Sequence, residues 1–218
     1  MILNVENFIY SFFRYFKKST NKYLITLLSK LFKFVFYFKI NYWKKFSFNE
    51  KVDFLKSFEK NFEYFWLDLK KKNKKLILSK SPNWYNWHIK YFRNFWITTL
   101  YQNNSVKGYA VCCERSNNKY QLKKFTIVDV VVSESSQESY IPLIINSIKK
   151  GHQLGYDIVD MIGTNQIKRN MFSTLKTFKK NNSNFLFYYY SNNESIMKAL
   201  SDLDIWDITL FDGDNFIV

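Results

Sequence analysis

The sequence predicts an α/β protein with a mixed, mostly antiparallel sheet, flanking helices, and amphipathic helices ahead of that sheet. Three observations predict this fold class. Apolar residues recur at helical spacing over roughly the first seventy residues. They alternate as in strands between residues 95 and 132. Beyond residue 137 helical and strand patterns alternate, which is typical of β-α-β units.

Three amphipathic helices are expected in the N-terminal part. The first covers residues 5–16, the second 23–43, and the third begins near Asn49 and runs past Leu69. The second segment is long enough to span a membrane, but Lys30 and Lys33 would then lie near the bilayer centre. A lysine there costs roughly 2.5–3.5 kcal/mol, so we expect no membrane span.

The second helix keeps two interpretations open. Its expected apolar face consists of Leu24, Leu27, Leu28, Leu31, Phe34, Val35 and Phe38. This face either packs in a core with a solvated basic face opposite, or lies on an anionic membrane surface with lysines outside.

The middle of the chain predicts an antiparallel meander. A short strand at 76–78 precedes a helix that starts at Ser81-Pro82, because proline suits the first helical position. Strands are then expected at 95–101, 106–115 and 119–132, joined by turns rich in Asn and Ser.

The last third alternates helices and strands. The expected helices are 137–153, 165–179 and 194–200, and the expected strands are 157–162, 185–190 and 206–210. The connection from Val132 to Asp157 is long enough for a helical crossover, so these two strands are expected to be parallel. Gly155 marks the end of the crossover helix.

Charge divides the chain unevenly. Residues 1–100 carry 20 Lys and Arg against 6 Asp and Glu, whereas residues 101–218 carry 13 against 12. All five glycines lie in the second part. We expect a basic aromatic helical extension over 1–48 and an α/β domain over 49–218.

The glycine and cysteine patterns exclude several classes of protein. No glycines have the spacing of a dinucleotide-binding or P-loop fingerprint. Cys112 and Cys113 are adjacent, so they form neither a disulfide framework nor a C-x-x-C metal pair. A reducing compartment and no signal peptide are expected, hence a cytoplasmic location with possible contact at the membrane periphery.

The order of the expected helices and strands and several short motifs are similar to those of a known family. The motifs are Trp87-His88-Ile89, Val106-Lys107-Gly108-Tyr109-Ala110-Val111, Ile127-Val128-Asp129 and the segment from Trp206 to Asp214. The region from Phe58 to the C-terminus resembles the GNAT superfamily of acyltransferases. Within it, the chain resembles the later lobe of tandem GNAT-like proteins associated with polysaccharide gene clusters.

The resemblance implies acetyl-CoA or another acyl-CoA as co-substrate and no metal. The residues that it implies for acyl-CoA binding are Val130, Val131, Val132, Ser135, Ser136, Gln137 and Asn165. The three valines would pair with the pantetheine arm, and the loop before the next helix would hold the pyrophosphate on its N–H groups. This loop departs from the family pattern, because it lacks glycine and contains Glu134 and Glu138. Phe172 stands where the family often has a tyrosine that protonates the thiolate.

Asp129 is the candidate catalytic base. On a regular strand it would share a face with Phe125, Ile127 and Val131, and a carboxylate among apolar residues is a candidate base for an amine. The alternative is a structural aspartate at a strand kink, paired with a surface lysine or a backbone N–H. Asp212 and Asp214 are interpreted as a chain-end turn around Gly213, not as a metal site.

Three functions remain open from the sequence. The first is a GNAT-type acyltransferase acting on an amine or a small sugar-derived acceptor. The second is a non-catalytic GNAT-like lobe whose N-terminal helices dock a missing lobe or a protein partner. The third is a basic module that contacts an anionic membrane or nucleic acid; the absence of any nucleic-acid motif in the sequence makes nucleic acid the weaker of these two partners.

Overall fold

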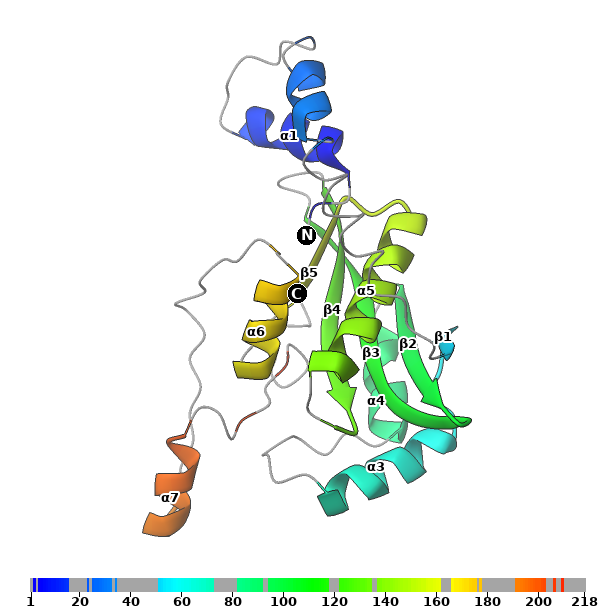
Figure 1. Cartoon of the computed structure of the whole chain (residues 1–218), viewed down its shortest axis with the longest axis vertical. Coiled ribbons are helices and arrows are strands. Elements are labelled where there is room, and N and C mark those ends of the chain that lie inside the picture. Colours follow the sequence, from blue (N-terminus) through cyan, green and yellow to red (C-terminus); the bar gives the residue numbers. More distant parts are fainter. Residues whose placement is uncertain are drawn as a thin grey trace.

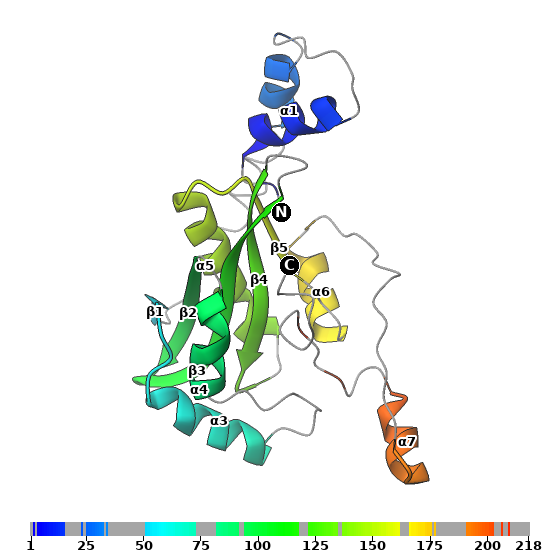
Figure 2. The same cartoon turned by 180° about the vertical axis from the view of Figure 1, so that it is seen from behind.

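The computed structural model describes residues 2, 4–15, 23, 25–32, 34, 51–72, 82–91, 94–117, 122–134, 137–161, 166–175, 177, 191–202, 206 and 209. One sheet forms the centre of the molecule, with α5 on one face and α3 and α4 on the other (Figures 1 and 2). The predicted fold class, a mixed and mostly antiparallel α/β sheet preceded by N-terminal helices, is confirmed.

The helices and strands occur in the following order. They are α1 (Val5–Tyr15), β1 (Lys51–Leu55), α3 (Asn61–Lys72), α4 (Pro82–His88), the 3-10 helix η1 (Ile89–Tyr91), β2 (Phe95–Gln102), β3 (Ser105–Asn117), β4 (Leu122–Val132), α5 (Gln137–Gln153), β5 (Ile158–Met161), α6 (Gln166–Thr174) and α7 (Glu194–Leu200). Residues 23, 25–32 and 34 are also helical.

The sheet order is β1-β2-β3-β4-β5. All neighbours are antiparallel except β4 and β5, which are parallel and joined through α5. The predicted meander and the predicted crossover are therefore both confirmed. The tight turn between β2 and β3 uses Asn103 and Asn104 at φ 50° and 59°, the left-handed region that asparagine tolerates.

The helix predicted to begin near Asn49 is wrong in its first half. Residues 51–55 form strand β1, with Val52 opposite Leu100 and Phe54 opposite Thr98, and the helix begins only at Asn61. Apolar residues at 52, 54 and 55 fit a strand edge as well as a helical face. The free edge of β2 decides between them, because pairing there satisfies the backbone groups of both segments.

Two apolar cores lie on opposite faces of the sheet. One packs α5 against β3, β4 and β5 and includes Phe125, Ile127 and Leu143. The other packs α3 and α4 against β2, β3 and β4 and includes Tyr85 and Tyr109. Gly108 allows a close approach on the α5 side, since a Cβ there would lie 2.9 Å from the Val131 carbonyl oxygen and 3.1 Å from Leu143 Cδ1.

Helix α5 has the predicted bounds, and its end is set by Gly155 at φ 75°. Two residues after Gly155, Asp157 connects the N-terminal segment to the sheet by hydrogen bonds. Its Oδ1 accepts from Asn7 Nδ2 at 2.8 Å, and its backbone oxygen accepts from the Asn4 N–H at 3.0 Å. Its Oδ2 accepts from the Lys123 N–H at 2.9 Å, so one side chain links α1, β4 and β5.

Other predictions have mixed outcomes. Helix α6 covers Gln166–Thr174, which lies inside the expected 165–179, and α7 matches the expected 194–200. The strands expected at 76–78 and 185–190 lie outside the described residues, as does most of 206–210. The division of the chain at residue 48 stays a prediction.

Among the described helices, none combines the length and the apolar character needed to cross a bilayer.

Candidate functional site

The candidate site is built around a bulge in β4. Val111 pairs with Asp129, but the next residue of β3, Cys112, pairs with Ile127, so Val128 is an extra residue. The bulge reverses the alternation of side chains along β4. Asp129 therefore faces α4, and it does not share a face with Phe125 and Ile127, as regular alternation predicts.

Backbone groups of β4 beyond the bulge point in alternate directions. The Ser133 N–H donates to the Lys107 carbonyl at 2.8 Å, which makes residues 107 and 133 a hydrogen-bonded pair of the ladder. Alternation then directs the N–H and C=O of Val131 toward β3. It directs those of Val130 and Val132 away from β3, toward the side of the sheet where β5 lies.

The described pairing between β4 and β5 is short. It runs from Lys124 opposite Ile158 to Ile127 opposite Met161. β4 continues to Val132, and within the described ranges no strand pairs with residues 130–132 on this side (Figure 1). The three valines that the resemblance assigns to the pantetheine arm thus lie on the stretch of β4 that follows the bulge.

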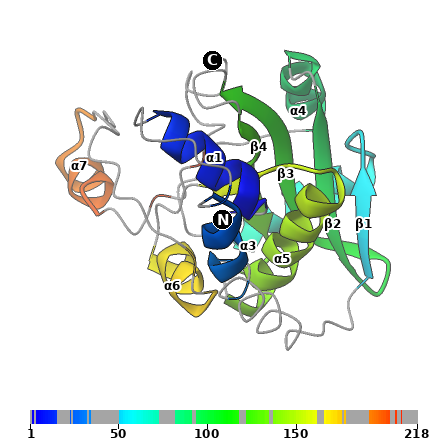
Figure 3. The same cartoon turned by 90° about the horizontal axis from the view of Figure 1, so that it is seen from above.

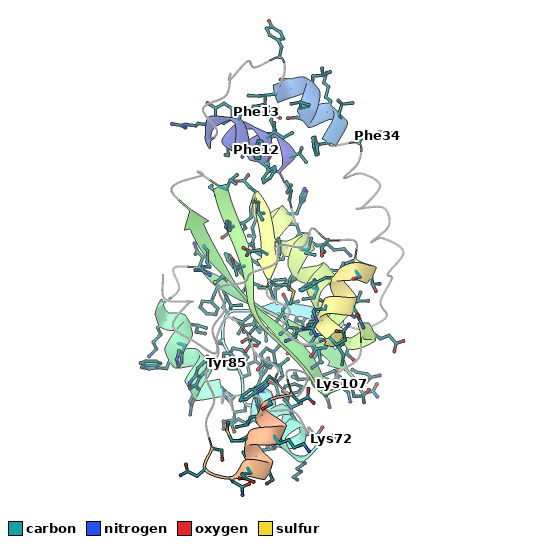
Figure 4. The ribbon with its side chains drawn as sticks, turned by 90° about the vertical axis from the view of Figure 1, so that its left-hand side faces the viewer. Phe12, Phe13, Phe34, Lys72, Tyr85 and Lys107 are labelled. Carbon is teal, nitrogen blue, oxygen red and sulfur yellow. The ribbon has the colours of Figure 1, made fainter. Side chains whose placement is uncertain are left out.

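Asp129 belongs to a buried chain of hydroxyl groups. Tyr109 OH donates to Tyr85 OH at 2.8 Å, and Tyr85 OH donates to Asp129 Oδ2. All three side chains are at most 1% exposed. Tyr85 comes from α4 (Figure 4) and Tyr109 from β3, so the hydrogen-bonded chain joins the helix to the bulge.

Aromatic rings enclose these hydroxyl groups. Phe58 stacks on Tyr85 at a centroid distance of 4.4 Å, and Phe62 and Phe65 meet the Tyr109 ring edge-on at 5.6 and 5.7 Å. Burial raises the pKa of Tyr85 well above the ordinary tyrosine value, and the Asp129 carboxylate raises it further. Tyr85 therefore keeps its proton at neutral pH and serves as a donor.

Tyr85 and Tyr109 were not expected at the site. Helical spacing in the sequence predicts one face with Trp84, Trp87, His88 and Tyr91, but in the structure Trp84 stacks on His88 and Trp87 is 55% exposed. Tyr85 and Ile89, four residues apart, form the buried face. This spacing is the signal that could have identified Tyr85.

The region expected to bind pyrophosphate is described in part. Ser133 closes the ladder with Lys107, and Glu134 and Glu138 are exposed on either side of the start of α5. Ser135, Ser136 and Asn165 lie outside the described residues. Gln137 is the first residue of α5, and nothing further is described of its side chain.

A buried lysine lies beside the first turns of α5. Lys168 of α6 is 1% exposed, and its Nζ is 5.6 Å from the centre of the Tyr140 ring. Sequence spacing marks this position only as the residue three after Asn165. The burial of a lysine between α5 and α6 depends on how the two helices pack, which the sequence does not show.

The two cysteines are buried on opposite faces of β3. Burial raises the pKa of Cys112 to about 12, although hydrogen bonds with Ser147 and Thr98 act in the other direction. Burial also raises the pKa of Cys113. Both thiols are therefore protonated and unsuited to nucleophilic chemistry. The described ranges hold no group of three or more His, Cys, Asp or Glu residues that could bind a metal ion.

Neither protein-family models nor curated proteins match this chain. Among solved structures, an aminoglycoside acetyltransferase from an uncultured soil metagenomic sample, in complex with trehalose, aligns at 14% identity and TM-score 0.46. The alignment covers 66% of this chain and 97% of that one. The glucosamine-6-phosphate N-acetyltransferase from Arabidopsis thaliana aligns at 12% identity and TM-score 0.47, over 65% of this chain and 100% of that one.

A predicted acetyltransferase from Clostridium acetobutylicum, solved with acetyl-CoA, aligns at 10% identity and TM-score 0.44. It covers 64% of this chain and 96% of the other. From Pro82 to Thr174 the order of helices and strands described above is the one that the sequence predicts, and it is in this order that the chain resembles the GNAT superfamily.

Proposed function

We propose that this chain is a GNAT-type acyltransferase that moves an acetyl or other acyl group from acyl-CoA to an amine or a sugar-derived acceptor. The observation that carries the proposal is the bulge in β4 together with the stretch that follows it. There Val130 and Val132 turn backbone N–H and C=O groups away from β3. An extended pantetheine arm carries amide groups that match such a strand edge.

Residues around β4 supply the chemistry of this mechanism. The acceptor amine attacks the thioester carbonyl carbon, the C–N bond forms, and the C–S bond breaks to release the CoA thiolate. N–H groups of β4 beside Val131 that point away from β3 stabilise the developing oxyanion. Asp129 takes the proton of the attacking amine as general base.

Tyr85 and Tyr109 hold the base in position through hydrogen bonds. Tyr85 donates to Asp129 and fixes one carboxylate oxygen, and Tyr109 in turn fixes the Tyr85 hydroxyl. Since the carboxylate is 1% exposed in this structure, the proton reaches it through a local opening beside α4. Both tyrosines are positioning residues in this proposal.

The donor site uses cationic and polar groups in place of glycines. Ser135, Ser136 and Gln137, which in the sequence precede or begin α5, bind the pyrophosphate, and Asn165 comes immediately before α6 in the sequence. Lys168 adds a cation beside the first turns of α5. This cation offsets Glu134 and Glu138, whose charges would otherwise repel the pyrophosphate.

Titration calorimetry of the full chain with acetyl-CoA tests donor binding. A 1:1 complex that the Lys168→Met variant weakens supports the proposal. No heat of binding at millimolar acetyl-CoA contradicts it and favours a non-catalytic lobe. Far-ultraviolet circular dichroism of each variant shows that a loss of binding is not a loss of folding.

A second experiment tests the base. We expect Asp129→Asn to lower kcat by roughly 10²–10⁴ with acetyl-CoA affinity unchanged, since the asparagine oxygen still accepts from Tyr85. The matched control is Thr98→Val, which removes a buried hydroxyl that lies 2.9 Å from Ser147 Oγ on the α5 side. If both variants lower kcat equally, Asp129 is not the base.

A further inference from the structure

The N-terminal helical unit, which consists of α1 and the helical residues 23, 25–32 and 34, presents an exposed apolar stripe. Tyr23, Leu27, Leu31 and Phe34 are 89%, 58%, 59% and 65% exposed. They follow each other at intervals of four, four and three residues, so they lie along one side of the helix. Large apolar side chains in a continuous row mark an interaction surface, whereas scattered ones do not.

Other residues form the core that the structure describes in this unit. Ile25 and the half-buried Leu28 pack against Val5 and Ile9 of α1, and Ser29 is buried on the same side. The apolar face predicted for 23–43 is therefore divided. Leu28 points inward, while Leu27, Leu31 and Phe34 remain exposed.

The unit stands at one end of the molecule. Figure 1 shows it beyond the ends of β4 and β5, Figure 3 views the molecule from this end, and Figure 4 places Phe12, Phe13 and Phe34 at the opposite end from Lys72 of α3. Phe12 of α1 is a further exposed aromatic, at 49%. The proposed acyl-transfer site therefore does not compete with this unit for the same surface.

Positive charge accompanies the stripe. Lys30 and Arg14 are both exposed, and residues 1–50 contain nine Lys and Arg against two Asp and Glu. Beside the stripe, a hollow of about 470 Å³ is lined by Tyr23, Thr26, Leu27 and Lys30. A lysine beside exposed apolar side chains suits an anionic headgroup above an acyl chain.

We propose that the N-terminal helical unit docks the protein on an anionic lipid bilayer, with the stripe Tyr23–Leu27–Leu31–Phe34 inserted at the interface. Apolar side chains enter the boundary between headgroups and acyl chains, while Lys30 and Arg14 contact anionic headgroups. A protein partner would need acidic side chains at matching positions. The bilayer meets the same need with any anionic lipid, and the net positive charge of residues 1–50 adds long-range attraction.

Co-sedimentation of the full chain with vesicles tests the proposal. We expect binding to vesicles of phosphatidylcholine with 30% phosphatidylglycerol, weaker binding at higher salt, and much weaker binding to pure phosphatidylcholine. The double variant Leu27→Gln/Leu31→Gln should lower the partition coefficient by about tenfold or more, because two half-exposed leucines no longer enter the interface. Lys30→Glu should lower it by roughly fivefold or more.

Matched controls lie elsewhere on the surface. Leu67 of α3 and Leu154 after α5 are 57% and 41% exposed, so Leu67→Gln/Leu154→Gln removes comparable apolar area outside the unit. This control should bind vesicles as the native chain does. Lys70→Glu on α3 is the corresponding control for charge.

Three results would overturn the proposal. Equal binding to neutral and anionic vesicles would remove the role of charge. Equal loss in the stripe variant and its control would remove the role of the stripe. A dimer without vesicles that the stripe variant dissociates, as measured by size-exclusion chromatography with light scattering, would assign the stripe to a second copy of the chain. Acetyl-CoA binding is a separate measurement, so this proposal and the proposed function fail independently.

Discussion

Replacing Tyr85 by phenylalanine removes one hydroxyl group and leaves the ring in place. The ring keeps its stacking on Phe58 at 4.4 Å, so no cavity forms. What is lost is the hydrogen bond to the Asp129 carboxylate and the acceptor for the Tyr109 hydroxyl. The substitution thus isolates the hydrogen-bonded chain from the aromatic packing around it.

The expected loss follows from the kinds of hydrogen bond involved. A bond to a charged group contributes about 1.5–3 kcal/mol, and one between neutral groups about 0.5–1.5 kcal/mol. Tyr85→Phe removes one of each, so the free energy of unfolding should fall by about 2–4 kcal/mol. Tyr109→Phe removes only the neutral bond and should cost about 1 kcal/mol.

Urea unfolding followed by tryptophan fluorescence measures the free energy of unfolding of both variants. For a chain of this size, the loss in Tyr85→Phe corresponds to a decrease in Tm of roughly 4–16 °C. The two single variants and the double variant form a thermodynamic cycle. Equal losses in Tyr85→Phe and Tyr109→Phe would refute the reasoning, because the bond to Asp129 would then contribute nothing.

The same hydroxyl gives the native chain a pH dependence. The folded state raises the pKa of Tyr85 above its unfolded value of about 10. Below pH 10 both states carry this proton, and the contribution of Tyr85 to stability is constant. Above pH 10 the unfolded state loses the proton first, so stability should fall as pH rises. Tyr85→Phe should make this alkaline decrease shallower.

Three further predictions concern the glycines and the thiols. Gly108→Ala should lower the free energy of unfolding by about 1–3 kcal/mol, because the new Cβ would lie 2.9 Å from the Val131 carbonyl oxygen; a loss below 0.5 kcal/mol in urea unfolding would contradict this contact. Gly155→Ala should lower the free energy of unfolding by about 1–2 kcal/mol because alanine disfavours the φ of 75°, although a new Cβ would meet no atom within 4 Å. Gly155→Asn should lower it less, and equal losses in the two variants, measured by the same urea unfolding, would argue against backbone strain. Cys112 and Cys113 should react with a thiol reagent at pH 8 only after unfolding, because burial raises the pKa of both; rapid labelling of the native chain would show that β3 is accessible.

The outcome for β4 shows where sequence reasoning ends. Alternation identifies the strand, and its three valines predict a segment covered on both faces. Alternation cannot place the bulge at Val128, because the same residues could form a strand with or without a bulge. Pairing with β3 determines the bulge, and the bulge determines that Asp129 meets Tyr85, a residue 44 positions earlier in the chain.

The helix at residues 23–34 shows the same limit in another form. Helical spacing identifies an amphipathic segment, but its apolar residues cover more than one contact surface. Packing on α1 decides that Ile25 and Leu28 turn inward and that Leu27, Leu31 and Phe34 are left exposed.

The sequence by itself determined the order of elements from Pro82 to Thr174, because periodicity, turn residues and helix ends are local properties of the chain. It also determined the basic character of the N-terminal part and the absence of a glycine-rich phosphate loop. Only the tertiary structure decided that residues 51–55 add a strand to the sheet, that Tyr85 donates to Asp129 and Tyr109 to Tyr85, and that Lys168 is buried beside α5. Each of these depends on a partner far away in the sequence, and local patterns carry no information about such partners.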